Sequence, residues 1–398
     1  MKQYLNWRSA LLLLLLALSL QSCLGFGGNN GNSNFKTTNT GSGQIGVNQG
    51  NQIVFNGKIY FTIGHRLWVL DGTRNLHQLT GGKTAVRDPA ISPDGKWIAF
   101  DAVSKNSSDL VYISVNGGKM HMLRSGNGSY YYKGQFVHSS STWNVQPAWS
   151  ADSSHLLFLS DFEKEDWYSY TGIDAPLLDL QAFSIPLSNP SAVQDVAYAY
   201  FGDGGNRDPS YRPGHPDQII YTHYAYDVTR TQQLVQLFME NPNAIASYPR
   251  GHYYPGEPGF DPGVAITPPT IECIEPAFSP DGNSIAYIKR IGVDQMGLYV
   301  MPTPENITSS PNSSTVAKKA LLPYKQSSLI IKGQFISQPF WSPDGKQIAY
   351  LSYNNQSFDI WLATLTIDPK TGRYVMKGSP VQLTNGGIDG DSRPVWTA

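Results

Sequence analysis

The sequence predicts an all-β protein: a six-bladed β-propeller closed by pairing of N- and C-terminal strands in one shared blade. Three observations support this fold class: the composition, a repeat anchored on proline, and complementary fragments at the two ends of the repeat region. Of 398 residues, only 15% are charged, whereas 12% are aromatic, 38 are glycine and 27 are proline. Few charges with many aromatic residues and turn formers are typical of short strands joined by tight turns.

Residues 1–22 have the features of a bacterial lipoprotein signal peptide. Lys2 and Arg8 precede an apolar run, Ala10–Leu20, that is too short to cross a bilayer roughly 30 Å thick as a helix. The run ends in Leu20-Gln21-Ser22-Cys23, which resembles the lipobox. The resemblance implies that Cys23 carries lipid and holds the protein to a membrane, facing the periplasm or the cell surface. The alternative is an ordinary secretory peptide with an incidental cysteine.

Residues 23–52 are expected to be a flexible tether. They are rich in Gly, Asn, Ser and Thr and show no apolar periodicity. Such a segment cannot bury enough surface to offset the entropy of ordering. The folded body, a propeller, is therefore predicted to span residues 53–398.

A repeat of one β-hairpin recurs through the body. Three full copies carry Ser-Pro-Asp-Gly followed by a short apolar strand, and two copies are degenerate. Ser-Pro-Asp-Gly suits a type I turn, because proline presets φ at the second position and glycine accepts positive φ. A proline precedes each apolar position by two residues. The full copies begin at Ile91, Phe278 and Trp341, the degenerate ones lie near Trp149 and Tyr211, and the prolines are Pro89, Pro147, Pro209, Pro276, Pro339 and Pro394.

The two ends of the body complete each other. Residues 53–88 read as the second, third and fourth strands of a blade, at Lys58–Phe61, Leu67–Leu70 and His77–Thr80. Residues 394–398 begin a further copy of the repeat but stop after its first strand. Together the two fragments have about the length of one propeller blade, roughly 40–45 residues. One blade shared by both ends would remove the free sheet edges, so six prolines predict six blades.

These repeats resemble the WD40-like PD40 repeats of TolB-like six-bladed propellers. The resemblance covers residues 53–398. It rests on the Pro-x-aromatic-Ser-Pro-Asp-Gly units, on Asp359-Ile360-Trp361, and on the strand endings Gln78-Leu79-Thr80 and Gln382-Leu383-Thr384. It is specific for fold and uninformative about activity, since this propeller carries many functions.

The residue before each repeat proline is the main candidate for a binding site. In the family geometry this position enters the innermost strand, so the resemblance implies that six polar groups ring a central channel at its mouth. At least one acid of this set is expected to pair with a neighbouring arginine. The acids that remain unpaired would favour a ligand with a cationic or hydroxyl-rich group. The alternative is that these groups only bond channel water and strand ends. The six residues are Asp88, Gln146, Asp208, Glu275, Gln338 and Arg393, with Arg87 and Arg207 beside two of them.

No enzyme motif is present. The sequence contains no Gly-x-Ser-x-Gly elbow, His-Glu-x-x-His or Walker loop, so we assign no catalytic residue and expect no cofactor. The Asp203–Asp208 and Asp389–Asp391 segments suggest calcium loops but lack the full ligand spacing, and ordinary turns explain them better. No metal site is therefore predicted. A net charge of −1 also argues against nucleic acid as a partner.

Two long insertions, 161–206 and 239–272, are rich in aromatic residues and proline. Loops of this length in a compact fold are usually functional or disordered, and these could recognise a ligand or cap the propeller. The leading functional hypothesis is a lipid-anchored, non-catalytic binding or scaffold protein for a peptide, protein or glycan at the cell envelope. The alternative is an extracytoplasmic hydrolase or lyase that uses carboxylates at the channel mouth.

Overall fold

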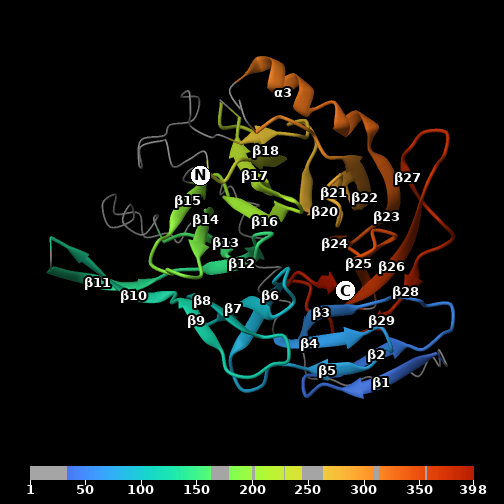
Figure 1. Cartoon of the computed structure of the whole chain (residues 1–398), viewed down its shortest axis with the longest axis horizontal. Coiled ribbons are helices and arrows are strands. Elements are labelled where there is room, and N and C mark those ends of the chain that lie inside the picture. Colours follow the sequence, from blue (N-terminus) through green and yellow to red (C-terminus); the bar gives the residue numbers. More distant parts are fainter. Residues whose placement is uncertain are drawn as a thin grey trace, which may run out of the picture. The chain divides into compact units, whose positions relative to one another are not determined.

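The computed structural model describes residues 34–133, 135–162, 179–199, 202–227, 229–243, 263–308, 313–354 and 356–398. The signal peptide and Cys23 lie outside the described residues. Residues 35–398 form one compact unit. Within the described ranges, six of its sheets have four or five strands each, arranged around a common centre (Figure 1).

Each of these six sheets is an antiparallel meander, as the repeat predicted. The first sheet, shared by both ends of the chain, consists of β30 (Val395–Thr397), β3 (Lys58–Ile63), β4 (Arg66–Asp71) and β5 (Leu76–Gln78). The next two consist of β6 (Ala85–Ile91), β7 (Trp97–Val103), β8 (Ser108–Ser114) and β9 (His121–Arg124), and of β12 (Asn144–Trp149), β13 (His155–Ser160), β14 (Gln181–Pro186) and β15 (Gln194–Ala197). The last three consist of β16 (Asn206–Arg212), β17 (His215–Tyr226), β18 (Gln233–Glu240) and β19 (Val264–Ala265); of β20 (Cys273–Phe278), β21 (Ser284–Gly292), β22 (Gln295–Pro302) and β23 (Ser328–Gly333); and of β24 (Ile336–Trp341), β25 (Gln347–Asn354), β26 (Ser357–Ile367), β27 (Tyr374–Met376) and β28 (Val381–Gln382).

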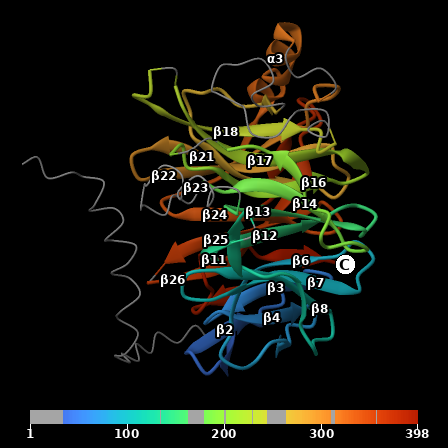
Figure 2. The same ribbon diagram turned by 90° about the vertical axis from the view of Figure 1, so that its left-hand side faces the viewer.

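The innermost strands form a closed ring. Strands β6, β12, β16, β20, β24 and β30 each contact the next in this order, and β30 returns to β6. The shared blade closes the ring as predicted, because β30 pairs with β3 and sets Ile59 opposite Trp396. Viewed from the side, β3 and β4 lie across the same unit from β17 and β18 (Figure 2).

The predicted turn chemistry is present in all three full copies. In the first copy, the Ser92 hydroxyl donates to Asp94 Oδ1 at 2.6 Å and accepts from the Trp97 N–H at 2.9 Å. The Gly95 N–H donates to the Ser92 carbonyl, and Gly95 has a φ of 70°. Positive φ is readily available to glycine and costly for other residues, which explains the glycine at this position.

Two predictions about the N-terminal region are wrong. Residues 35–48 are not a tether, since β1 (Phe35–Asn39) pairs with β2 (Gln44–Asn48), and β2 pairs with β29 (Thr384–Asn385), in a three-stranded sheet. Ile45 and Val47 are buried in the same cluster as Phe55 and Leu383. Counting this sheet, the described residues form seven blades, one more than the six predicted. Phe35, Ile45 and Val47 are the only apolar residues in this polar segment, which is too few for the composition to indicate strands, and the pairing partner β29 lies more than 330 residues away in the chain.

Two further elements stand outside the blades. Strands β10 (Asn127–Tyr132) and β11 (Gln135–Ser141) form a hairpin that projects from the body (Figure 1). Helix α3 (Ser314–Ala320) and the 3-10 turn η2 (Pro323–Gln326) lie in the connection between β22 and β23. The only α-helix among the described residues is therefore short, and no helix there is long and apolar enough to cross a membrane.

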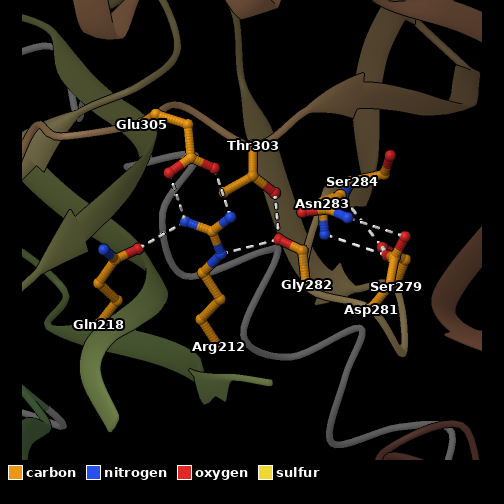
Figure 3. A network of polar contacts seen from close by, with 9 residues as sticks. All are labelled: Arg212, Gln218, Ser279, Asp281, Gly282, Asn283, Ser284, Thr303 and Glu305. Atoms are coloured by element: carbon orange, nitrogen blue, oxygen red, sulfur yellow. Dashed lines mark hydrogen bonds and ion pairs between the residues drawn. The ribbon is translucent and has the colours of Figure 1, made fainter. Parts of the chain in front are cut away.

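A buried arginine locks two neighbouring blades together (Figure 3). Arg212, at the end of β16, is 1% exposed and binds both oxygens of Glu305, which follows β22. Its Nε donates to the Gly282 carbonyl at 2.8 Å, and its Nη1 donates to Gln218 Oε1 at 2.8 Å. Such a planar fork satisfies the guanidinium on three sides, which is what burial of this charge requires.

Candidate functional site

The pre-proline residues sit in a repeated distortion of the innermost strands. In five blades, pairing with the second strand shifts register at the pre-proline and proline positions, as between Arg87 and Ala90. Proline cannot donate to a ladder, so a bulge accommodates it and re-aims the preceding side chain. Along the described strands, the pre-proline residues with left-handed φ are Asp88 (50°), Gln146 (54°), Asp208 (56°), Glu275 (56°) and Gln338 (48°).

Non-glycine residues rarely adopt left-handed φ, and each instance costs about 1–3 kcal/mol unless its surroundings enforce it. Here hydrogen bonds between neighbouring blades supply that enforcement. Gln146 Oε1 accepts the Asp208 N–H at 2.7 Å, and Glu275 Oε2 accepts the Gln338 N–H at 2.6 Å. Asp88 Oδ1 likewise accepts the Arg393 N–H at 2.8 Å. The pre-proline side chains therefore join blades pairwise, which is the structural role the sequence left open.

Two residues that sequence reasoning missed complete this network. The Asp88 N–H donates to the Ser392 hydroxyl at 2.9 Å, and the Glu275 N–H donates to the Thr222 hydroxyl at 3.1 Å. Ser392 lies directly before Arg393, but no repeat marks it. Thr222 lies inside β17, where the alternation gives no sign of a role in the channel.

Burial disfavours the charged forms of the acids in this ring. Desolvation, reinforced by the neighbouring Asp208 carboxylate, raises the pKa of Glu275 to about 8. Desolvation also raises the pKa of Asp88 and of Asp208, although the Arg393 guanidinium opposes the shift in both. Asp101, on β7, was not predicted; burial and the nearby Asp88 raise its pKa well above the usual range. At neutral pH, Glu275 is therefore largely a neutral acid.

Arg393 crosses the ring. It lies just before β30, yet its Nη1 points to the Pro209 carbonyl of β16 at 3.4 Å and its Nη2 to the Pro147 carbonyl of β12 at 3.3 Å. Strand β16 is three places from β30 in the cyclic order, so this side chain spans the centre of the channel. Its Nε is 3.8 Å from Asp88 Oδ1.

A cavity of about 590 Å³ opens beside this arginine, within the size range of small-molecule sites. We call it the central cavity. Its polar lining includes Asp208, Glu275, Gln338 and Arg393, whereas Asp88 and Gln146 lie outside the lining. Its apolar wall includes the repeat prolines, the turn prolines and the aromatic residues two places after the repeat prolines: Pro89, Pro93, Pro147, Pro209, Pro213, Pro276, Pro280, Pro339, Pro343, Pro394, Trp149, Tyr211, Phe278, Trp341 and Trp396.

Two of the three indole groups of this wall, those of Trp149 and Trp341, are held by bonds between blades. Trp149 Nε1 donates to the Ala90 carbonyl at 2.9 Å, and Trp341 Nε1 donates to the Ala277 carbonyl at 3.1 Å. In each case the acceptor directly follows the repeat proline of the preceding blade. A buried indole N–H needs such a partner, and the bond fixes the ring at the cavity wall.

The long insertions do not contribute to this cavity within the described residues. No described residue of 161–206 or 239–272 appears in its lining. Residues 163–178, 200–201 and 244–262 lie outside the described part of the chain, and with them most of the aromatic residues on which the prediction depended.

The two acidic segments considered as calcium loops have other partners. Asp389 accepts the N–H groups of Gly64 and His65 at 3.0 and 2.7 Å, and Asp203 pairs with Arg230 at 2.9 Å. Within the described ranges, no group of three or more His, Cys, Asp or Glu side chains is placed to hold a metal. Cys273 is a buried free thiol whose pKa burial raises to about 12.

No protein-family model matches the sequence, and no curated protein matches it. Solved structures do match the fold. TolB from Acinetobacter baumannii is 14% identical with a TM-score of 0.51, over 85% of this chain and 66% of that one. A putative TolB from Agrobacterium tumefaciens is 15% identical with a TM-score of 0.42, over 63% of this chain and 75% of that one. An oligogalacturonate lyase in complex with manganese is 10% identical with a TM-score of 0.45, over 89% of this chain and 96% of that one. At such identities the likeness concerns the fold, and by fold this chain is a TolB-like β-propeller.

Proposed function

We propose that this chain is a non-catalytic binding or scaffold protein of the cell envelope, held to a membrane by lipid on Cys23. The central cavity carries the proposal. It is open, it has the volume of a ligand site, and it concentrates charged and amide groups within an otherwise apolar wall of proline and indole. Rigid aromatic and proline surfaces around a few polar groups are what recognition of a peptide, protein segment or glycan requires.

The enzymatic alternative rests on the raised pKa of Glu275, which is what a general acid needs. The hydrogen bonds of that carboxyl favour the binding role. Its Oε2 accepts the Gln338 N–H at 2.6 Å, and its Oε1 lies 3.4 Å from the Gln338 side-chain nitrogen. Asp208 is similarly engaged by Gln146 and Thr222. Carboxyls that tie strands together are less free to take and give protons.

Paired variants test the location of the site. Peptides selected from a random hexapeptide library, and a panel of neutral and acidic oligosaccharides, serve as probes in titration calorimetry. The Asp208→Asn/Glu275→Gln double variant alters the cavity wall. The Lys96→Ala/Lys346→Ala double variant is the control, because those side chains are 71% and 79% exposed beside the repeat turns.

We expect the cavity variant to change affinity by about tenfold or more while the control binds like the wild type. Equal affinities for both variants, or a loss in the control alone, would place the site elsewhere. Turnover of any oligosaccharide by the wild type and not by Glu275→Gln would establish the enzymatic alternative instead.

A further inference from the structure

Arg393 is the least satisfied charged group in the lining of the central cavity. Its two terminal nitrogens reach carbonyls only at 3.3 and 3.4 Å, beyond the usual 2.7–2.9 Å of charge-assisted bonds. Its Nε has no hydrogen-bond partner among the described residues, since Asp88 Oδ1 is 3.8 Å away. The side chain is 18% exposed and lines the cavity. Because Nε is buried, the capacity left for a ligand lies in the two terminal nitrogens, whose contacts with carbonyls are long.

The acids of the same ring, in contrast, have short hydrogen bonds and little exposure. Glu275 Oε2 and Asp88 Oδ1 each accept a backbone N–H, at 2.6 and 2.8 Å. Asp88 and Asp208 are only 5% and 7% exposed. Glu275 reaches the cavity, but with a pKa of about 8 it is mainly protonated at neutral pH. The cavity therefore offers a ligand one fixed positive charge and no comparably accessible fixed negative charge on the pre-proline residues.

We propose that the central cavity binds a carboxylate, and that Arg393 is the group that recognises it. The apolar wall around Arg393 fits a carboxylate attached to an apolar body, and the carboxyl-terminal end of a peptide with an apolar last residue has this chemistry. A planar guanidinium accepts a carboxylate in a two-point arrangement that no other side chain reproduces. This inference rests on the proposed binding function and names the ligand class. It replaces the cationic or hydroxyl-rich ligand that the acids alone suggested.

Three probes of similar shape separate the possibilities: N-acetylphenylalanine, its C-terminal amide, and phenethylamine. They present an anion, a neutral group and a cation on the same benzyl framework. Binding is measured by titration calorimetry and by the NMR signals of arginine Nε–H groups in the wild-type protein. We expect the free acid to bind at least about tenfold more tightly than the amide, and to shift the Arg393 signal.

Variants at the arginine complete the test. Arg393→Gln should lower affinity for the free acid at least about tenfold and leave affinity for the amide unchanged. Arg393→Lys keeps the charge without the fork and should recover only part of the loss. Arg373→Gln is the matched control, since Arg373 is exposed in the turn between β26 and β27. If the Arg393 variants fold poorly, the comparison of acid and amide in the wild type decides alone.

Each other outcome overturns the inference. Equal binding of acid and amide would exclude carboxylate recognition while leaving the cavity as a binding site. Tighter binding of phenethylamine would assign recognition to the acids and would also leave the proposed function standing. Binding of none of the three probes would reject both the carboxylate site and the central cavity as a ligand site.

Discussion

Glu275 combines two unfavourable local features, a left-handed φ and a desolvated carboxyl, with a hydrogen bond that stabilises the ring. It is held in left-handed φ, its carboxyl is desolvated, and its Oε2 accepts the Gln338 N–H from the next blade. The hydrogen bond couples two blades, while burial makes ionisation of the same group unfavourable. The folded protein therefore prefers the protonated acid, and the preference predicts a dependence of stability on pH.

The first prediction concerns that dependence. The pKa of Glu275 is raised to about 8 in the folded state, above the usual value of 4.5. The folded state therefore holds the proton more tightly, so this group lowers the free energy of unfolding as pH rises from about 5 to about 8. Glu275→Gln should flatten this fall and be more stable than the wild type at pH 9 by at least about 1.4 kcal/mol. Urea unfolding across pH 5–9 measures it, and identical pH profiles would contradict it.

The second prediction concerns the Arg212 lock (Figure 3). Arg212→Met keeps an apolar stem but removes the donor to Gln218 and Glu305 and one of two donors to the Gly282 carbonyl, which keeps the Thr303 hydroxyl. Glu305 is 56% exposed and stays hydrated without the arginine, so the cost comes from the hydrogen bonds that buried groups lose, and we expect a loss of about 1–3 kcal/mol in urea unfolding.

An exposed ion pair is the matched control for the arginine lock. Arg290 pairs with Glu272 at 3.0 Å, and their side chains are 48% and 50% exposed. Arg290→Met should cost less than about 1 kcal/mol, because solvent screens such pairs. Comparable losses in the two variants would show that Arg212 does not lock the blades.

At the scale of elements, closure depends on the short strand β30. It contributes one edge of the shared blade, and its Trp396 is 6% exposed and packs edge-on against Phe55 and Phe340. The Trp396 indole also donates to the Asn56 carbonyl at 2.7 Å. A three-residue strand thus joins the two ends of the ring by both pairing and core packing.

The third prediction follows from this closure. Deleting residues 392–398 should expose the β3 edge, remove the Trp396 side chain from the core and lower the free energy of unfolding by more than about 3–5 kcal/mol. Thermal unfolding with tryptophan fluorescence measures the loss of cooperativity. Replacing the exposed turn 369–372 with two glycines is the control and should change little. A truncated chain that melts like the full one would mean that the ring does not need β30.

The three-stranded sheet of β1, β2 and β29 covers apolar surface that the other blades leave open. Strand β2 adds Ile45 and Val47 to the cluster that contains Phe61, Leu351 and Leu383, and it pairs with β29 on one side and with β1 on the other. Without them, this apolar surface between two blades would face water. A segment with little apolar content of its own is therefore ordered by the surface it covers.

At the scale of the whole molecule, attachment to a membrane is a separate question from the fold. The proposed attachment is lipid on Cys23, a residue outside the described part of the chain. This assignment depends on Leu20-Gln21-Ser22-Cys23 after an apolar run. Acyl chains supply membrane affinity through their buried methylene groups, independently of the propeller.

The fourth prediction tests that attachment. Cys23→Ser should move the protein from the membrane fraction to the soluble extracytoplasmic fraction, because the lipid has no other acceptor at the lipobox. Cys273→Ser is the control: this thiol is buried and should not affect fractionation. Fractionation followed by immunoblotting measures both. Retention of the Cys23 variant in the membrane pellet would reject the lipoprotein interpretation.

The sequence by itself determined the repeat, the turn of each hairpin, the pre-proline set and the shared blade. Ser-Pro-Asp-Gly encodes its turn locally, and the fragments at 53–88 and 394–398 could be recognised because each lacks what the other contains. Only the tertiary structure revealed the sheet of β1, β2 and β29, the reach of Arg393 to Pro147 and Pro209, and the buried positions of Asp101 and Ser392. The reason is physical: turns and alternation depend on neighbours in the chain, whereas strand recruitment, burial and pKa depend on surfaces assembled from residues hundreds of positions apart.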